Sequence, residues 1–204
     1  MESTNFDRTD HHLISEFKAG SMEAMEEIVE RYENRIFTFG LKMCGHRYLQ
    51  DAEDITQETF LNAFRYLKDF REETKLKNWL FMIASRACIR KRRKKKCEPE
   101  YEMSLDSFIH EDGSDGGYEI PDWSDDPSDN IMRAELKKII DAAVQTLSHK
   151  YRLTFNLRDI EGFSTKETAE ILGISTESVK TRLHRARLFL REQISTSYKE
   201  RAIQ

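Results

Sequence analysis

Apolar residues recur in the first part of the chain at the spacing of amphipathic helices. A period of 3.6 residues is typical of an α-helix with one buried face. The pattern predicts one helix over residues 10–19 and a second from Ser21, a helix-capping residue type, to about Cys44. The apolar faces carry Leu13, Ile14 and Phe17 in the first helix and Met25, Ile28, Val29, Tyr32, Ile36 and Met43 in the second.

Two further helices are predicted on either side of a polar loop at 69–75. The first covers about 51–68, with Asp51 as its cap and acidic residues in its first turn, where they complement the helix dipole. The second covers about 76–95, and Trp79 lies on its apolar stripe, which favours core packing over stacking on a base. The two apolar faces carry Ile55, Phe60, Ala63, Phe64 and Leu67, then Leu76, Trp79, Leu80, Ile83, Ala84 and Ala87.

The middle of the chain, 97–129, lacks a sustained period and holds all three Pro residues. Its Gly, Pro and acidic residues predict a flexible linker. The helical period then resumes with Met132, Leu136, Ile140, Ala143 and Leu147, and a further helix is predicted over 149–161. The pattern predicts an all-α protein of two small helical domains joined by a flexible acidic linker, with bounds at 1–96, 97–130 and 131–204.

Residues 164–191 have the pattern of a helix-turn-helix. Ser164 and Glu167 form a capping box, and Gly173 suits the left-handed turn that ends the first helix. Ser175 is predicted to cap the second helix, whose core stripe carries Val179, Leu183, Ala186 and Leu190. Its other faces carry Lys180, Thr181, Arg182, His184, Arg185 and Arg187, the donors and cations that a DNA recognition helix needs. The alternative is an αα-hairpin with a solvated basic face.

Charge is distributed in three blocks, although the net charge is only −4. Residues 90–96 read RKRRKKK, residues 97–132 hold twelve acidic residues and no Lys or Arg, and residues 176–191 hold five basic residues and one acidic. The acidic average therefore does not exclude a nucleic-acid partner. The basic run alone is also consistent with a solvated helix end.

Several function classes are not indicated. No stretch of eighteen apolar residues is present and the N-terminus lacks a signal-peptide pattern, so a cytoplasmic protein without membrane insertion is expected. Cys44, Cys88 and Cys97 are widely spaced, so we expect inert thiols and neither a metal nor a cofactor. A redox role for Cys97 beside the basic run stays open, and His11 and His12 are interpreted as a pair at a disordered chain end.

Three stretches carry a resemblance to a known family. They are ERYENRIFTFGLKMCG and DAEDITQETFLNAFRYL at 30–45 and 51–67, FREETKLKNWLFMIASRACIRKRRKKK at 70–96, and LTFNLRDIEGFSTKETAEILGISTESVKTRLHRARLFLRE at 153–192. In this order they resemble regions 2.1–2.2, 2.3–2.4 and 4 of bacterial sigma factors of the extracytoplasmic-function (ECF) class, in the sigma-70 family. The resemblance covers about 15–95 and 131–194.

The resemblance implies three sets of site residues. Docking on the β′ clamp helices of core RNA polymerase falls to Asp51, Glu53, Asp54, Gln57 and Glu58. The resemblance implies that one flipped base is held near 70–78. The residues that it assigns to recognition and melting of the −10 element are Phe70, Lys75, Lys77, Asn78, Arg86, Arg90 and Arg93. Recognition of the −35 element falls to Ser178, Lys180, Thr181, Arg182, His184, Arg185 and Arg187. Lys180, Thr181 and His184 align with base-facing positions, and the arginines with phosphate contacts.

The resemblance also implies partners and departures. Region 4 is expected on the polymerase β flap, the linker in the polymerase cleft, and an anti-sigma factor as a further partner. Arg86 and Arg90 stand where the family usually has Asn and Asp, which affects the expected −10 preference. Thr154, Asn156 and Thr168 stand at usually apolar positions, so a loosely packed region 4 core is expected. The rival readings are an autonomous helix-turn-helix regulator and an enzyme that acts on DNA.

Overall fold

The computed structural model describes residues 8–45, 48–94 and 139–202, and every regular element in these ranges is helical. The first group comprises α1 (Asp10–Lys18), α2 (Met22–Cys44), α3 (Leu49–Tyr66), the 3-10 turn η1 (Leu67–Asp69) and α4 (Leu76–Lys94). The second group comprises a helix whose described part is 139–146, then α6 (His149–Phe155), the π-helical turn η3 (Asn156–Ile160), α7 (Thr165–Leu172) and α8 (Thr176–Ala202). The predicted all-α fold is confirmed, while the predicted linker, Cys97, Met132 and Leu136 lie outside the described residues.

The predicted start signals are mostly confirmed. The side chain of Ser21 accepts a hydrogen bond from the backbone N–H of Ala24 at the start of α2. The prediction that Asp51 caps the next helix is wrong. Helix α3 begins at Leu49 after Tyr48, so Asp51 lies in the first turn, where its charge still complements the helix dipole.

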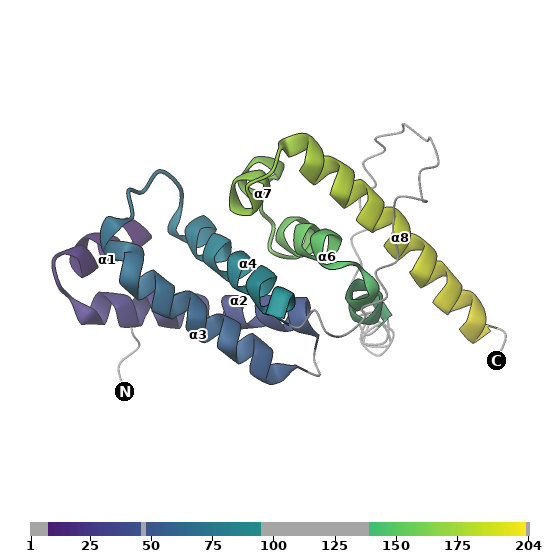
Figure 1. Ribbon diagram of the computed structural model, residues 1–204, viewed down its shortest axis with the longest axis horizontal. Coiled ribbons are helices and arrows are strands. Elements are labelled where there is room, and N and C mark those ends of the chain that lie inside the picture. The colour runs from purple at the N-terminus through teal and green to yellow at the C-terminus, as the bar shows by residue number, and fades with distance from the viewer. Residues whose placement is uncertain (1–7, 46–47, 95–138, 203–204) are drawn as a thin grey trace, which may run out of the picture.

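The first four helices form one packed unit, with α1 to α4 at the left of Figure 1. Helices α2 and α3 approach closely at Gly40, where an added Cβ would lie 3.2 Å from the Cα of Ala52. That distance is tighter than most real Cβ contacts, so a side chain at Gly40 would require the backbone of α3 to shift by a few tenths of an ångström.

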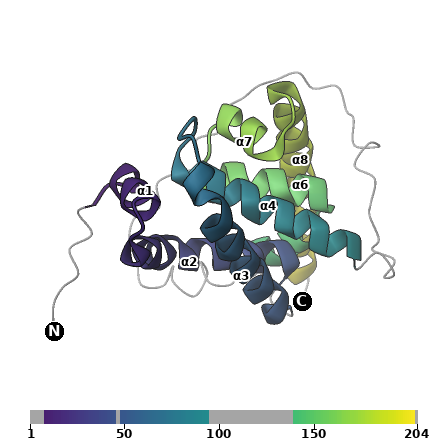
Figure 2. The same ribbon diagram turned by 60° about the vertical axis from the view of Figure 1, so that its left-hand side comes forward.

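A single hydrophobic cluster continues from this unit into the second group of helices. Phe81 of α4 lies at the junction, with ring centroids 5.2 Å from Phe39 and 5.0 Å from Phe163, both in edge-on geometry. Leu153 and Leu157 are buried in the same cluster. Figure 2 shows α4 running beside α6 and α7, so the two halves of the chain share a core.

Hydrogen bonds from Arg152 and Gln145 to the end of α2 strengthen this junction, and this set of bonds is called the latch below. The guanidinium of Arg152, in α6, donates to the carbonyl of Met43 at 2.9 Å and to that of Leu147 at 2.9 Å. The amide of Gln145 donates to the carbonyl of Lys42 at 2.8 Å. Helix C-termini carry unpaired carbonyls and partial negative charge, so a buried cation is well placed there.

The helix-turn-helix has the predicted local geometry. Ser164 and Glu167 exchange both bonds of the capping box, at 2.9 and 3.1 Å, and Gly173 has a φ of 65° in the left-handed region. The unusual polar residues Thr154, Asn156 and Thr168 are completely buried. Within the described residues, Asn156 Oδ1 and Thr168 Oγ1 lack a hydrogen-bond partner, so these positions weaken a core that is nevertheless closed.

Candidate nucleic-acid and partner interfaces

The first half of α8 presents the predicted recognition surface. The hydroxyl of Ser175 accepts a hydrogen bond from the backbone N–H of Ser178 at 3.2 Å, which confirms the predicted cap. Lys180, Thr181 and His184 are exposed on this helix and lie within its first three turns. They are the residues that the resemblance aligned with base-facing positions, and the surrounding helices leave them uncovered.

The flanking residues of α8 are less free. Arg187 donates two hydrogen bonds to the carboxylate of Asp159, at 3.0 and 2.8 Å. Arg185 lies 3.5 Å from the hydroxyl of Tyr151, and the hydroxyl of Ser178 lies 2.9 Å from that of Ser175. These contacts orient the side chains that the sequence predicted for phosphate binding.

A second basic surface, at the start of α4, is covered by α7. Asn78 is only 4% exposed, and its amide donates to Glu167 Oε1 at 3.2 Å. Lys75 pairs with the same carboxylate at 3.5 Å. Hydrogen bonds from Ser164 and then from Asn78 lower the pKa of Glu167 to about 2. The carboxylate is therefore charged at neutral pH and occupies the donors predicted to hold the −10 strand.

Glu161, at the end of η3, completes this cover. Its carboxylate pairs with Arg35 at 3.2 Å, and its carbonyl accepts a hydrogen bond from Lys77 Nζ at 3.2 Å. The same Nζ lies 4.2 Å from the ring centroid of Phe163. Burial, and then the charge of Arg35, lower the pKa of Lys77.

The remaining residues predicted for the −10 element divide between buried and exposed positions. Phe70 is 8% exposed, and its ring centroid lies 4.9 Å from that of Trp79. The predicted core packing of Trp79 is confirmed in part, because it is half-buried against the main cluster. Arg86 and Arg93 are exposed, whereas Arg90 pairs with Glu58 at 2.5 Å.

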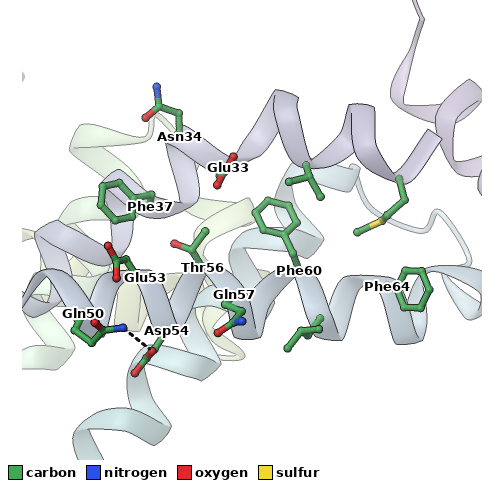
Figure 3. A pocket seen from close by; sticks show the side chains of 13 residues that line it. Glu33, Asn34, Phe37, Gln50, Glu53, Asp54, Thr56, Gln57, Phe60 and Phe64 are labelled. Atoms are coloured by element: carbon green, nitrogen blue, oxygen red, sulfur yellow. Dashed lines mark hydrogen bonds between the residues drawn. The ribbon is translucent and has the colours of Figure 1, made fainter. Parts of the chain in front are cut away.

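The acidic residues of α3 form two groups. On one side, Lys91 of α4 pairs with Asp51 at 3.0 Å and with Asp54 at 2.5 Å, beside the Arg90–Glu58 pair. The bond from Lys91, followed by that from Gln50, lowers the pKa of Asp54. On the other side, Glu53 lies between α3 and α2, while Gln57 and the Lys91-paired Asp54 line the edge of the same space (Figure 3).

A groove between α2 and α3 lies on that second side (Figure 3). Its lining is polar and acidic near the start of α3, where Glu33, Asn34, Gln50, Glu53, Asp54 and Gln57 face it. It is apolar toward the end of α3, where Met25, Val29, Phe60, Leu61 and Phe64 face it. Leu61 and Phe64 are 50% and 44% exposed, so the groove is an open apolar surface with a charged end.

Comparison with known proteins assigns both halves of the chain. The model of Sigma-70 region 2 matches residues 28–97, and that of Sigma-70 region 4 matches residues 137–190. The ECF RNA polymerase sigma factor SigW of Bacillus subtilis is 34% identical over 184 residues, which is 89% of this chain and 94% of that protein. The chain belongs to the ECF sigma factors.

Other relatives agree with this assignment. The ECF RNA polymerase sigma-E factor of Haemophilus influenzae is 28% identical and covers 91% of this chain and 95% of its own length. A similar fold is also found in the structure of CnrH in complex with the cytosolic domain of CnrY, with a TM-score of 0.62, 22% identity, and coverage of 92% of this chain and 97% of that chain. For the sigma factor RpoE in complex with the anti-sigma factor NepR from Bartonella quintana, the TM-score is 0.59, the identity 22%, and the coverage 83% and 96%.

The groove of this ECF sigma factor contains residues that the sequence analysis missed. Glu33, Phe37 and Leu61 were not assigned to any surface, and Phe64 was predicted to lie in the core. A signal was present, because Gln57, Leu61 and Phe64 recur at helical spacing on a face of α3 different from the buried Ile55 and Ala63. The docking prediction was based on the polar and acidic residues of 51–58 and did not include the apolar residues beside them.

Other surfaces of the described residues carry no comparable chemistry. Cys88 is buried, and burial raises the pKa of its thiol. No helix within 8–45, 48–94 or 139–202 combines the length and apolar character needed to cross a bilayer.

Proposed function

We propose that this chain binds core RNA polymerase, directs it to specific promoters and helps to open the −10 element. The observation that carries the proposal is the presence, in one chain, of an acidic-to-apolar groove on α2 and α3 and an exposed basic recognition helix at the start of α8. Neither surface alone specifies initiation. Together they provide a docking site for the polymerase and a reader for promoter DNA.

The groove suits a helical partner with cations at one end and apolar residues at the other. The clamp helices of the polymerase β′ subunit are the occupant that the family assignment implies. Glu53 and Gln57 are exposed and face the groove, so they are the predicted docking residues most available to a partner. Asp51 and Glu58 instead support α4 through Lys91 and Arg90, so their contribution to docking is indirect.

The proposed division of labour follows the predicted domains. Residues 1–96 act as region 2, residues 131–204 as region 4, and residues 97–130 as an acidic linker that passes through the positively charged polymerase cleft. The β flap is the expected second contact of region 4. An anti-sigma factor is a further proposed partner, supported by the two sigma-factor complexes with similar folds.

The chain is proposed to act as a cytoplasmic initiation factor in bacteria and not as an enzyme by itself. An autonomous helix-turn-helix regulator would bind duplex DNA tightly without a polymerase. The test is transcription by core RNA polymerase from a library of promoter fragments, with and without the protein. Promoter-specific transcripts are expected only with the protein. Tight duplex binding by the protein alone, with no promoter-specific transcript, would support the rival.

The groove can be tested by a pair of charge reversals on one helix. Glu33→Lys places a cation in the groove and should weaken binding to core polymerase about tenfold, because it meets the cations expected of the partner. Glu30→Lys is the matched control, since Glu30 is exposed on α2 but does not line the groove. Affinity is measured by fluorescence anisotropy with labelled protein. Equal affinities for the two variants would contradict the assignment of the groove.

A further inference from the structure

The loop between η1 and α4, residues 70–75, contains a residue in a strained backbone conformation. Glu72 has a φ of 58°, and among the described residues it is the only non-glycine with a positive φ. Residues other than Gly, Asn and Asp rarely adopt this region, and such conformations persist only where surrounding contacts impose them. Glu72 lies in the loop that the proposed function places against the −10 strand.

The contacts that hold this loop come from α1. His11 Nδ1 lies 2.5 Å from Glu72 Oε2, and Lys18 Nζ lies 3.5 Å from Glu72 Oε1. The same Nζ donates to the carbonyl of Phe70 at 2.6 Å. Two side chains of one helix thus hold the loop by a backbone carbonyl and by the side chain of its strained residue. The bond to His11 is also the main cause of a lowered pKa at Glu72.

Helix α1 is itself fixed to the body of the protein. Asp10 accepts hydrogen bonds from the hydroxyl of Tyr32 at 2.5 Å and from Arg31 at 2.7 Å, both on α2. Leu13, Ile14 and Phe17 are buried in the main cluster. The anchor of the loop is therefore a rigid helix and not a second mobile segment.

We propose that α1 sets the conformation of the 70–75 loop through Glu72, and that His11, Lys18 and Glu72 are positioning residues for reading the −10 element. This inference rests on the proposed function and extends it to a helix that precedes the residues matched by the region 2 model, 28–97. In this proposal the flipped base is held beside a loop whose shape is imposed before binding. Ordering before binding lowers the cost of binding and makes a wrong base less easily accommodated.

The decisive variant is Glu72→Gly. It removes the backbone strain of a positive φ and the side-chain contacts with α1 at the same time, so stability and −10 preference should respond in different directions. Glycine accepts a positive φ without cost, so the thermal midpoint of the protein should be unchanged or higher. The side-chain contacts with His11 and Lys18 are lost while the bond from Lys18 to the carbonyl of Phe70 remains, so amide exchange in residues 70–75 should become faster. With core polymerase, the preference for the best −10 sequence over single-base variants should fall by about three- to tenfold, the effect expected when a short loop must be ordered on binding.

The second variant is His11→Ala, with His12→Ala as its matched control. His12 is the adjacent histidine and pairs with Glu16 of its own helix at 3.2 Å, so it does not contact the loop. His11→Ala should reduce −10 discrimination and add little to Glu72→Gly in the double variant, since both remove one anchor. His11→Lys, which supplies a side-chain donor for the carboxylate of Glu72, should recover part of the discrimination. Glu73→Gly controls for added flexibility in the loop.

The outcomes are distinguishable. If the parent protein gives no promoter-specific transcript with core polymerase, the proposed function fails, and the inference with it. If the parent is active while Glu72→Gly and His11→Ala keep its −10 preference and its loop exchange rates, the inference alone is overturned. A lower thermal midpoint for Glu72→Gly with unchanged −10 preference would assign Glu72 a purely structural role and would also overturn it.

Discussion

The two basic surfaces of this sigma factor differ in what covers them. At the start of α8, Lys180, Thr181 and His184 are exposed. At the start of α4, Lys77 and Asn78 are covered by η3 and α7, through Glu161 and Glu167. Both surfaces are predicted to bind DNA. The residues predicted to face the −35 bases are open, whereas on the −10 surface Lys77 and Asn78 are covered and Arg86 and Arg93 are exposed.

The difference follows from the charge of the covering residues. Glu161 and Glu167 present carboxylates to Arg35 and Lys75, where a DNA strand would present phosphates. A carboxylate and a phosphate compete for the same donors. We therefore expect the predicted −35 surface to bind DNA in the arrangement described, and Lys77 and Asn78 to become available to DNA only when α7 leaves α4.

The largest expected effect comes from breaking the latch between the two halves. Arg152→Ala removes the buried donors from the carbonyls of Met43 and Leu147. Each buried carbonyl left without its donor costs about 1–3 kcal/mol, and this variant affects more than one. We expect a lower free energy of unfolding in denaturant titrations and a larger radius of gyration by small-angle X-ray scattering.

The control for this variant separates opening from unfolding. Arg152→Lys keeps the charge but cannot serve several carbonyls with a planar fork, so an intermediate loss is expected. Helical circular dichroism should persist in both variants at low denaturant. A compact Arg152→Ala protein with parental stability would show that the latch does not hold the halves together.

The sequence predicted correctly those structural features that depend on local patterns. The capping box of Ser164 and Glu167, the turn at Gly173 and the cap at Ser175 all depend on residues within a few positions of one another. The boundaries of α1 to α4 were predicted to within about two residues for the same reason, apart from the cap assigned to Asp51. The helix predicted over 149–161 instead changes to a π-helical turn after Phe155, and α8 continues past 191 to Ala202.

The cover over the −10 surface could not be predicted from the sequence. The contact of Asn78 with Glu167 joins residues 89 positions apart, and that of Arg152 with Met43 joins residues 109 apart. Helical periods identify a buried face but not which helix buries it. The acidic residues of α3 show the same limit, since Asp51 and Glu58 pair with the basic run predicted to contact DNA.

A pair of substitutions tests the open and covered surfaces directly. Lys180→Ala should weaken binding of the isolated chain to −35 duplex DNA by about 1–3 kcal/mol and change the base preference. Lys77→Ala should leave the binding of the isolated chain to a −10 single strand unchanged, because that surface is covered. In the complex with core polymerase, Lys77→Ala should reduce permanganate reactivity of the −10 element. Equal effects of Lys77→Ala in both settings would remove the distinction between the surfaces.

The next smaller expected effect is a pH dependence of the free energy of unfolding. Burial, followed by the charges of Arg92 and Arg152, lowers the pKa of His149 from 6.5 to about 4. Between these values the unfolded chain binds a proton that the folded chain does not, so stability falls as the pH falls. The loss is about 1.4 kcal/mol per pH unit below 6.5, or about 2 kcal/mol at pH 5.

His149→Gln tests that assignment. The substitution should flatten the pH dependence of the unfolding free energy between pH 7 and 5, measured by denaturant titration. His184→Gln is the matched control, since His184 is exposed on α8. The same flattening in both variants would show that the effect is not specific to the buried histidine.

The smallest expected effect is a shift in the balance between covered and uncovered states. Glu167→Gln retains a side chain able to complete the capping box but removes the charge that faces Lys75. Exposed ion pairs contribute about 0–1 kcal/mol, so the affinity of the isolated chain for a −10 single strand should rise by a few-fold at most. Glu170→Gln is the control, because Glu170 is exposed on the same helix. The gain should shrink as salt is added, since screening weakens the parental ion pair and the strand contacts alike. A gain for Glu170→Gln equal to that for Glu167→Gln would assign the effect to net charge and not to the cover over α4.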